Sequence, residues 1–240
     1  MKPLRIGSFL IALALLAPAF ARADGMLQRL PADGAWARFR FLGMVEDQDG
    51  VQTKEDGYLT TSSVGVVTEN DERCRWIELV YQWDGREGEY DVSKWLIPER
   101  RLQKGEIPLD HVKRVWGKMW GKEARLYTDS TRNRYGNDYL ILAGPLQETK
   151  KLTEVKKVEY QNGTLTCEDG VVGRTRWDRE DMKFDAMSKI WFHEKAAFGV
   201  AAAEVQIIGK QDGSVFGKWN WTLILTDTGQ DAKTRLPESN

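Results

Sequence analysis

Apolar and polar residues alternate with a period of two along much of the chain. In residues 35–46, one face of the predicted strand carries Ala37, Phe39, Phe41, Gly43 and Val45. Residues 75–83 show the same alternation, with Ile77, Leu79 and Tyr81 on one face. This pattern predicts β-strands that bury one face and expose the other.

Further segments of strand-like composition follow, separated by turn signals. We predict strands at 58–68, 90–97, 155–161, 164–168, 171–179, 183–193, 200–209 and 214–227. Asp-Gly and Asn-Gly pairs supply the positive φ of tight hairpin turns, and they occur at Asp49-Gly50, Asp84-Gly85, Asn162-Gly163 and Asp212-Gly213. The sequence therefore predicts consecutive antiparallel hairpins.

The middle of the chain has a different period. Residues 109–120 carry apolar side chains at spacings of three and four, which indicates one stripe of a helix: Leu109, Val112, Val115, Trp116, Met119 and Trp120. Residues 139–146 fit either a short helix or a buried segment. We expect a mainly β (α+β) domain over residues 24–229, with a large curved antiparallel sheet, the helical insertion on its concave face, and a loose polar tail at 230–240.

The N-terminus has the three-part pattern of a cleaved signal peptide. Lys2 and Arg5 precede an uncharged run at 6–21, and small residues stand at Ala21 and Ala23. We expect cleavage after residue 23 and a protein in the periplasm or outside the cell. The alternative is a membrane anchor, but the apolar run is shorter than a spanning helix, and no later stretch has that length.

Charge changes the picture little. Cleavage would remove three of the 35 basic residues and leave 32 against 36 acidic ones, spread evenly along the chain. Because no basic block stands out, nucleic-acid binding is not expected.

Cys74 and Cys167 are the two cysteines. In an oxidising compartment an isolated pair usually forms a disulfide, so we predict a bridge between them. The alternative is two buried free thiols.

The sequence lacks the motifs of known catalytic and cofactor sites. His111 and Asp110 are sequence neighbours and would point apart on a helix. His193-Glu194 lacks the second histidine of a zinc-protease signature. We found no nucleophile elbow, phosphate-binding glycine loop or complete calcium loop. We therefore expect no catalytic residues, metal or cofactor, although carboxylates that converge only in space would permit a hydrolase.

Tryptophan is the unusual feature of the composition, with ten residues. Most of them fall in predicted strands. They either fill the interior of a wide sheet or line a cavity for an apolar or sugar-like ligand.

Residues 189–200 resemble a strand–turn–strand motif of exported bacterial proteins of unknown function related to the lipoprotein-carrier (LolA/LppX-like) fold. Ala197 stands where that motif has proline. Residues 73–78 and 95–99 are similar to other parts of such proteins. The resemblance implies a half-open barrel closed by helices, which holds acyl chains or other apolar ligands.

Our leading hypothesis is therefore an exported binding module of the cell envelope for an apolar or amphiphilic ligand such as a lipid. The candidate lining residues are Trp116, Met119, Trp120, Trp191, Trp219 and Trp221. The alternative is a structural or interaction protein of the envelope with a solid core and no ligand.

Overall fold

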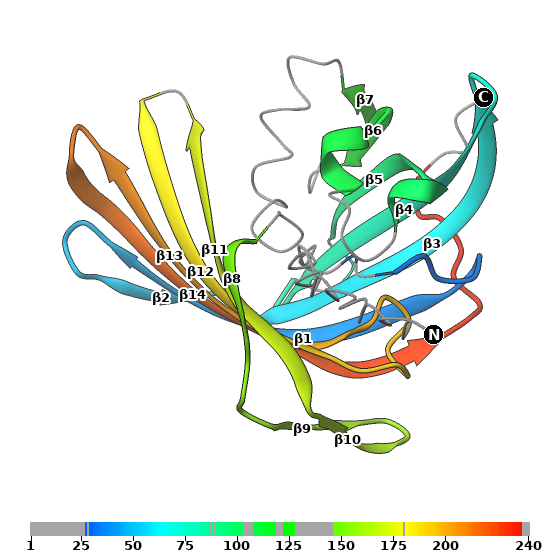
Figure 1. Cartoon of the computed structure of the whole chain (residues 1–240). Helices are drawn as coiled ribbons and strands as arrows, with labels where there is room; N and C mark the ends of the chain where they lie inside the picture. Colours follow the sequence, from blue (N-terminus) through cyan, green and yellow to red (C-terminus); the bar gives the residue numbers. More distant parts are fainter. Residues whose placement is uncertain are drawn as a thin grey trace, which may run out of the picture.

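The computed structural model describes residues 27, 29–86, 88, 90–102, 108–118, 122–127, 146–179 and 181–236. One twelve-stranded antiparallel sheet dominates them, in the order β7-β6-β5-β4-β3-β1-β14-β13-β12-β11-β8, with β2 paired to β1. A separate hairpin pairs β9 with β10. The sheet curves strongly, so that β11–β14 and β3–β7 rise on opposite sides of a concave face (Figure 1).

The strands follow one another as hairpins. The first half contains β1 (Trp36–Asp47), β2 (Gln52–Lys54), β3 (Gly57–Glu69), β4 (Glu72–Trp83), β5 (Asp91–Pro98), β6 (Arg114–Lys118) and β7 (Arg125–Tyr127), with two 3-10 helices, η1 (Glu99–Arg101) and η2 (Pro108–His111). The second half contains β8 (Gln147–Lys151), β9 (Lys156–Tyr160), β10 (Gly163–Cys167), β11 (Asp169–Arg179), β12 (Met182–Phe192), β13 (Val200–Gln211) and β14 (Ser214–Gly229).

The predicted hairpin turns are confirmed. Gly50, Gly85, Gly163 and Gly213 all have positive φ and connect paired or consecutive strands. The turn between β3 and β4 has no glycine. Asn70 and Asp71 adopt φ values of 51° and 59° there, a conformation that short polar side chains tolerate.

The helix predicted at 109–120 is wrong. Among the described residues of this stretch, 108–118, helix is confined to the 3-10 turn Pro108–His111, and Arg114–Lys118 form strand β6 between β5 and β7. Val115 and Gly117 are buried on one face of this strand. Over so few residues, the spacing of Val112, Val115 and Trp116 fits a short strand as well as a helix. Gly117 also disfavours a helix interior. As a strand, residues 114–118 form hydrogen bonds with backbone groups of β5 that would otherwise lie at the edge of the sheet.

The concave face carries the main core. Register places Phe41 beside Leu223, Leu223 beside Ala203, and Ala203 beside Ile190, so these side chains share one face. All four are at most 3% exposed.

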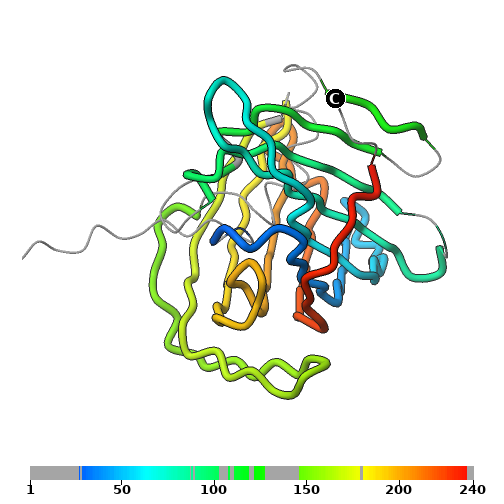
Figure 2. Tube along the Cα trace, turned by 90° about the vertical axis from the view of Figure 1, so that its right-hand side faces the viewer, coloured from blue at the N-terminus to red at the C-terminus, as the bar shows by residue number. Residues whose placement is uncertain are grey.

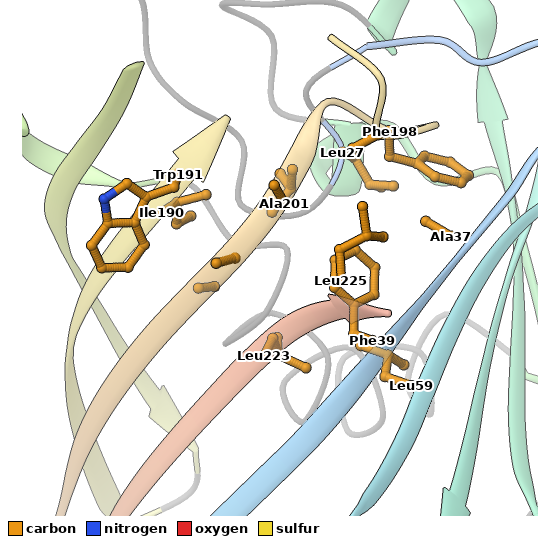
Figure 3. Packing of buried hydrophobic residues seen from close by; sticks show 14 of the residues in the cluster. Leu27, Ala37, Phe39, Leu59, Ile190, Trp191, Phe198, Ala201, Leu223 and Leu225 are labelled. Carbon is orange, nitrogen blue, oxygen red and sulfur yellow. The ribbon is translucent and has the colours of Figure 1, made fainter. Parts of the chain in front are cut away.

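The N-terminal residues and the loop between β12 and β13 help to cover this core. Figure 3 shows Leu27 and Phe198 close to Ala37 and Leu225, and all four side chains are at most 1% exposed. Arg29 donates hydrogen bonds to three carbonyl oxygens of the loop, which fixes the segment in place.

Two other segments cover the convex face. The β9–β10 hairpin lies beneath the sheet, away from the concave face (Figures 1 and 2), where β9 contacts β13 and β14. At the other end, Leu236 packs on Val80 and Val92. Residues 230–236 are therefore docked on the sheet, although the sequence predicted a loose tail from residue 230; residues 237–240 lie outside the described residues.

The predicted disulfide is not formed. Cys74 and Cys167 are free and buried. Cys74 lies on the convex face of β4 beside Trp76 and Leu96, whereas Cys167 ends the β9–β10 hairpin and belongs to a different buried cluster, which includes Val158 and Leu165 of that hairpin. The two thiols thus belong to different sheets and different clusters.

The predicted signal peptide at 1–23 and the segment at 139–145 lie outside the described residues. Within the described ranges, no helix combines the length and hydrophobicity needed to span a membrane.

Candidate ligand-binding face

Aromatic side chains run across the concave face from β4 to β11. We call them the aromatic row. Its members are Tyr81, Trp83, Phe41, Trp221, Trp219, Phe216, Phe184 and Trp177. These residues come from five strands, β1, β4, β11, β12 and β14. They lie on one face because the strands belong to one sheet.

Phe41 is the centre of one end of the row. Its ring centroid lies 6.2 Å from that of Tyr81, 5.6 Å from that of Trp83 and 5.7 Å from that of Trp221. Tyr81 and Trp83 stack at 5.7 Å, and both meet Phe41 edge-on. These are the offset and edge-to-face arrangements that aromatic pairs prefer.

The other end lies towards the hairpin tips of β11–β14. Trp177 stacks on its cross-strand partner Phe184 at 5.0 Å, with 5° between the ring planes. Phe184 meets Phe216 at 5.7 Å and Trp219 at 6.2 Å. Ala186, Val205 and Ile207, each at most 2% exposed, form the floor below these rings.

Glycines let the rings lie close to the sheet. A Cβ at Gly217 would stand 2.7 Å from the Trp219 ring, and a Cβ at Gly209 would stand 2.6 Å from the Phe216 ring. The two glycines face each other across β13 and β14. Any larger residue at either position would push a ring away from the backbone.

Except for the buried Tyr81 and Phe41, the members of the row are partly exposed. The same face is fully buried further along the strands, where Leu223, Leu225 and Ala203 lie in the core. The row is therefore the accessible continuation of the core, and it offers ring surface to a ligand.

Glu55 is an ionisable group beside the row. A Cβ at Gly43 would stand 2.7 Å from the Glu55 backbone oxygen, 3.0 Å from the Glu55 Cβ and 3.0 Å from the Phe41 ring, so Glu55 and Phe41 both lie close to this glycine. Trp221 is the cross-strand partner of Gly43 on its other side. Burial raises the pKa of Glu55, and the positive charge of Arg86 acts in the opposite direction.

The indole nitrogens of the row differ in their partners. Trp83 Nε1 donates to Asp91 Oδ2 at 3.3 Å. Trp221 Nε1 is buried, and among the described residues it has no hydrogen-bond partner. A buried donor without an acceptor is unusual, so this atom could serve a polar group of a ligand.

The structure brings together two of the predicted lining residues, Trp219 and Trp221. Trp116 lies on the convex face with Trp76 and Leu96. Trp191 is fully buried under the β9–β10 hairpin, where it donates to the Glu154 carbonyl at 3.1 Å. Met119 and Trp120 lie outside the described residues.

Six members of the row were not predicted as lining residues from the sequence: Phe41, Tyr81, Trp83, Trp177, Phe184 and Phe216. Their alternation within each strand was visible, but the pairing of distant strands that joins them was not.

Two open polar hollows lie away from the row. One, of about 540 Å³, is lined by the N-terminal segment, the β12–β13 loop and the end of β14. The other, of about 590 Å³, lies between the β3–β4 turn and η1. In the part of the chain that the structure describes, no three His, Cys, Asp or Glu side chains are grouped as a metal site would require.

No protein-family model and no curated protein matches the chain. Solved structures resemble it loosely. A Bacteroides fragilis protein assigned as exported, with a YmcC-like fold, gives a TM-score of 0.36 at 9% identity, over 86% of this chain and 100% of its own. A Parabacteroides distasonis protein assigned as a lipoprotein gives 0.34 at 9% identity, over 86% and 99%.

A Vibrio parahaemolyticus domain assigned to outer-membrane lipoprotein sorting gives a TM-score of 0.24 at 8% identity, over 87% of this chain and 89% of its own. These are the kinds of exported and lipoprotein-sorting proteins that the sequence resembled. At such TM-scores, no conclusion about ligand or activity follows from them.

Proposed function

We propose that this chain is an exported binding module of the cell envelope, which holds an apolar or amphiphilic ligand against the aromatic row. The observation that carries the proposal is two groups of contacting aromatic rings on one concave face, most of them partly exposed. Trp221 of one group and Trp219 of the other pack on the same buried cluster of Ala186, Val205 and Ile207. Binding sites for such ligands are concave and lined mainly by apolar and aromatic side chains. Binding, and not catalysis, is the function proposed.

The test uses the protein without residues 1–23 and the neutral amphiphile dodecyl maltoside below its critical micelle concentration. Tryptophan emission should change on binding, because the row contains four of the ten tryptophans. Trp221→Ala should weaken the dissociation constant about tenfold, the effect of removing a central aromatic contact.

Trp116→Ala is the matched control. Trp116 is also partly buried and its Nε1 also has no partner among the described residues, but it lies on the convex face. Equal loss of binding in the two variants would contradict the assignment to the row. Mass spectrometry of an organic extract of the purified protein should also find a bound lipid.

A second function has its own support. The rings contact one another and rest on glycines, so the row could be only the rim of a solid core in a structural or interaction protein of the envelope. In that case dodecyl maltoside would leave the tryptophan emission unchanged.

A further inference from the structure

We propose that the ligand presents an uncharged acyl carbonyl, such as that of an ester or an amide, to the indole N–H of Trp221. This inference rests on the proposed function and adds to it the chemistry of the ligand's polar group. The carbonyl oxygen would accept a hydrogen bond from Trp221 Nε1, and the apolar part of the ligand would lie against the rings of the aromatic row.

The indole N–H of Trp221 differs from those that have acceptors within the protein. Trp36 Nε1 donates to Asp231 Oδ1 at 2.7 Å, and Trp191 Nε1 donates to the Glu154 carbonyl at 3.1 Å. Trp221 Nε1 is buried and has no acceptor among the described residues. A buried donor without a partner costs free energy, and a ligand that brings an acceptor would recover it.

The position of Trp221 in the row assigns this N–H to a ligand. Trp116 Nε1 is also buried without a partner among the described residues, but Trp116 lies on the convex face. Trp221 belongs to the group of rings around Phe41 and also packs on the cluster beneath Trp219, so it joins the two groups of rings.

The N–H is reached by a movement of the ring. The Trp221 side chain is partly exposed, whereas its Nε1 is covered. The carbonyl oxygen therefore meets the N–H when the indole turns as the ligand is bound, a side-chain change of the kind that is common at binding sites.

The surroundings favour an uncharged acceptor without a donor of its own. The residues paired with Trp221 are Gly43 and Val205, which have no polar side chains. One neutral N–H does not replace the hydration of an anion, and an alkylammonium group has no acceptor to offer. Glu55 lies close to Gly43, and Arg86 acts on it with the opposite charge. A carbonyl also brings no O–H that would itself need a partner among apolar side chains.

The experiment compares two uncharged lipids that share the glycerol head group and the twelve-carbon chain, each below the concentration at which it aggregates. Monododecanoylglycerol has an ester carbonyl, and in dodecylglycerol an ether replaces the ester. We expect the ester to bind the protein without residues 1–23 about tenfold more tightly, because only its carbonyl is a strong acceptor for the buried donor. Near-ultraviolet circular dichroism checks that the protein remains folded, and this comparison needs no variant.

Trp221→Phe keeps an aromatic ring but removes the N–H, so it should reduce the preference for the ester to within about twofold. Trp219→Phe is the matched control, because it makes the same chemical change on the same face of the same strand. This variant should keep the preference, even if it weakens the binding of both lipids.

Heteronuclear NMR of the indole N–H groups observes the hydrogen bond itself. The indole signal that Trp221→Phe removes belongs to Trp221. In the wild type, monododecanoylglycerol should move this signal downfield in the proton dimension, and dodecylglycerol should move it much less. Packing of the lipid against the ring would shift the signal alike with both lipids.

The outcomes separate the two proposals. Equal affinity for the two glycerol lipids, or a preference that survives Trp221→Phe, would overturn the carbonyl and keep the binding function. Tighter binding of the anion dodecanoate than of monododecanoylglycerol, or binding of dodecyl maltoside alone, would do the same. If neither glycerol lipid nor dodecyl maltoside binds, the binding function itself is wrong, and the inference with it.

Discussion

Arg75 is a buried charge on the concave face of β4. It is 5% exposed, and its Nε and Nη2 donate to Glu99 Oε1 at 3.1 and 2.6 Å. Nη1 donates to Ser63 Oγ at 2.9 Å and lies 3.6 Å from Asp33 Oδ1. The guanidinium therefore joins β3, β4, η1 and the N-terminal segment.

Glu99→Gln should destabilise the protein by about 3 kcal/mol at neutral pH, because it leaves Arg75 buried without its main counter-ion. Chemical denaturation measures the change. Arg73→Gln is the control, since Arg73 also binds Glu99 but is 65% exposed, and it should cost no more than about 0.5 kcal/mol. Similar losses in both variants would contradict the role given to burial.

The same substitution has a defined pH dependence. Burial alone would raise the pKa of Glu99, but hydrogen bonds from Arg75 and Arg73 outweigh it and keep the pKa below its usual value. The stabilisation is then complete above the pKa of the unfolded chain and disappears as pH falls through the lower pKa of the folded state. The difference between the wild type and Glu99→Gln should shrink accordingly in acid.

On the scale of elements, residues 230–236 act as a strap across the convex face. Asp231 accepts a hydrogen bond from Trp36 Nε1 at 2.7 Å, and Ala232 N donates to the Gly34 carbonyl at 2.9 Å. Thr234 Oγ1 and Arg235 N donate to the Glu78 carboxylate at 2.7 and 3.1 Å. The strap thus supplies the donors that a carboxylate only 1% exposed requires.

Glu78 should give the opposite pH dependence to Glu99. Burial raises the pKa of Glu78, although Thr234, Arg235 and Lys94 act against it. A carboxyl group whose pKa is raised by folding destabilises the folded state as pH rises from the unfolded pKa through the folded one. The wild type should therefore lose stability relative to Glu78→Gln over that interval. Urea unfolding measures the free energies. If the difference in unfolding free energy between the wild type and Glu78→Gln did not change with pH, the pKa of Glu78 would not be raised by folding.

Gly217→Ala tests the packing of the aromatic row on β14. The new methyl group would lie 2.7 Å from the Trp219 ring, so the ring must move, at a cost of about 1–3 kcal/mol. Tryptophan emission should shift and ligand affinity should fall.

Trp219→Ala in the Gly217→Ala background should cost less than the sum of the single changes, because the clash is gone. Strict additivity in denaturant unfolding would mean that the ring does not rest on this glycine.

The sequence indicated these elements unequally. Long strands such as β12 and β13 were predicted from their alternation, and the hairpins from Asp-Gly and Asn-Gly pairs. Strand β6 was not, because its five residues are too few to separate a period of 2 from a period of 3.6. Trp191 shows why the site was harder to predict than the strands. Its strand was predicted, but its burial beneath the β9–β10 hairpin depends on contacts between segments that are distant in sequence.

At the scale of the whole molecule, the curved sheet gives its two faces different tasks. On the convex face, Trp191 donates to the Glu154 carbonyl, and Lys156 Nζ lies 4.8 Å from the centre of its ring. Lys156 also pairs with Glu204 at 2.7 Å. These contacts hold the β9–β10 hairpin against the sheet, whereas the concave face leaves its aromatic row partly open.

Substitutions on the two faces should therefore have separable effects. Trp191→Phe removes a buried hydrogen bond and part of a buried ring, so it should cost about 2 kcal/mol in unfolding free energy. Its folded form should bind dodecyl maltoside within about twofold of the wild type. Trp221→Ala should have the larger effect on binding, because Trp221 belongs to the aromatic row. Its loss breaks no hydrogen bond of Nε1 to another described residue, so the effect on stability should be smaller.

Amide hydrogen exchange with and without dodecyl maltoside should show which strands contact the ligand, and so which face of the sheet binds it. Ligand that binds only the folded state slows exchange wherever local opening would release it. Protection should rise in β1, β4, β11, β12 and β14, which carry the row, and should change little in β9 and β10. The hairpin touches the sheet only from the convex side, so equal protection there would mean that the ligand acts through global stability or binds elsewhere. The concave face would then lose its assignment even if an amphiphile binds.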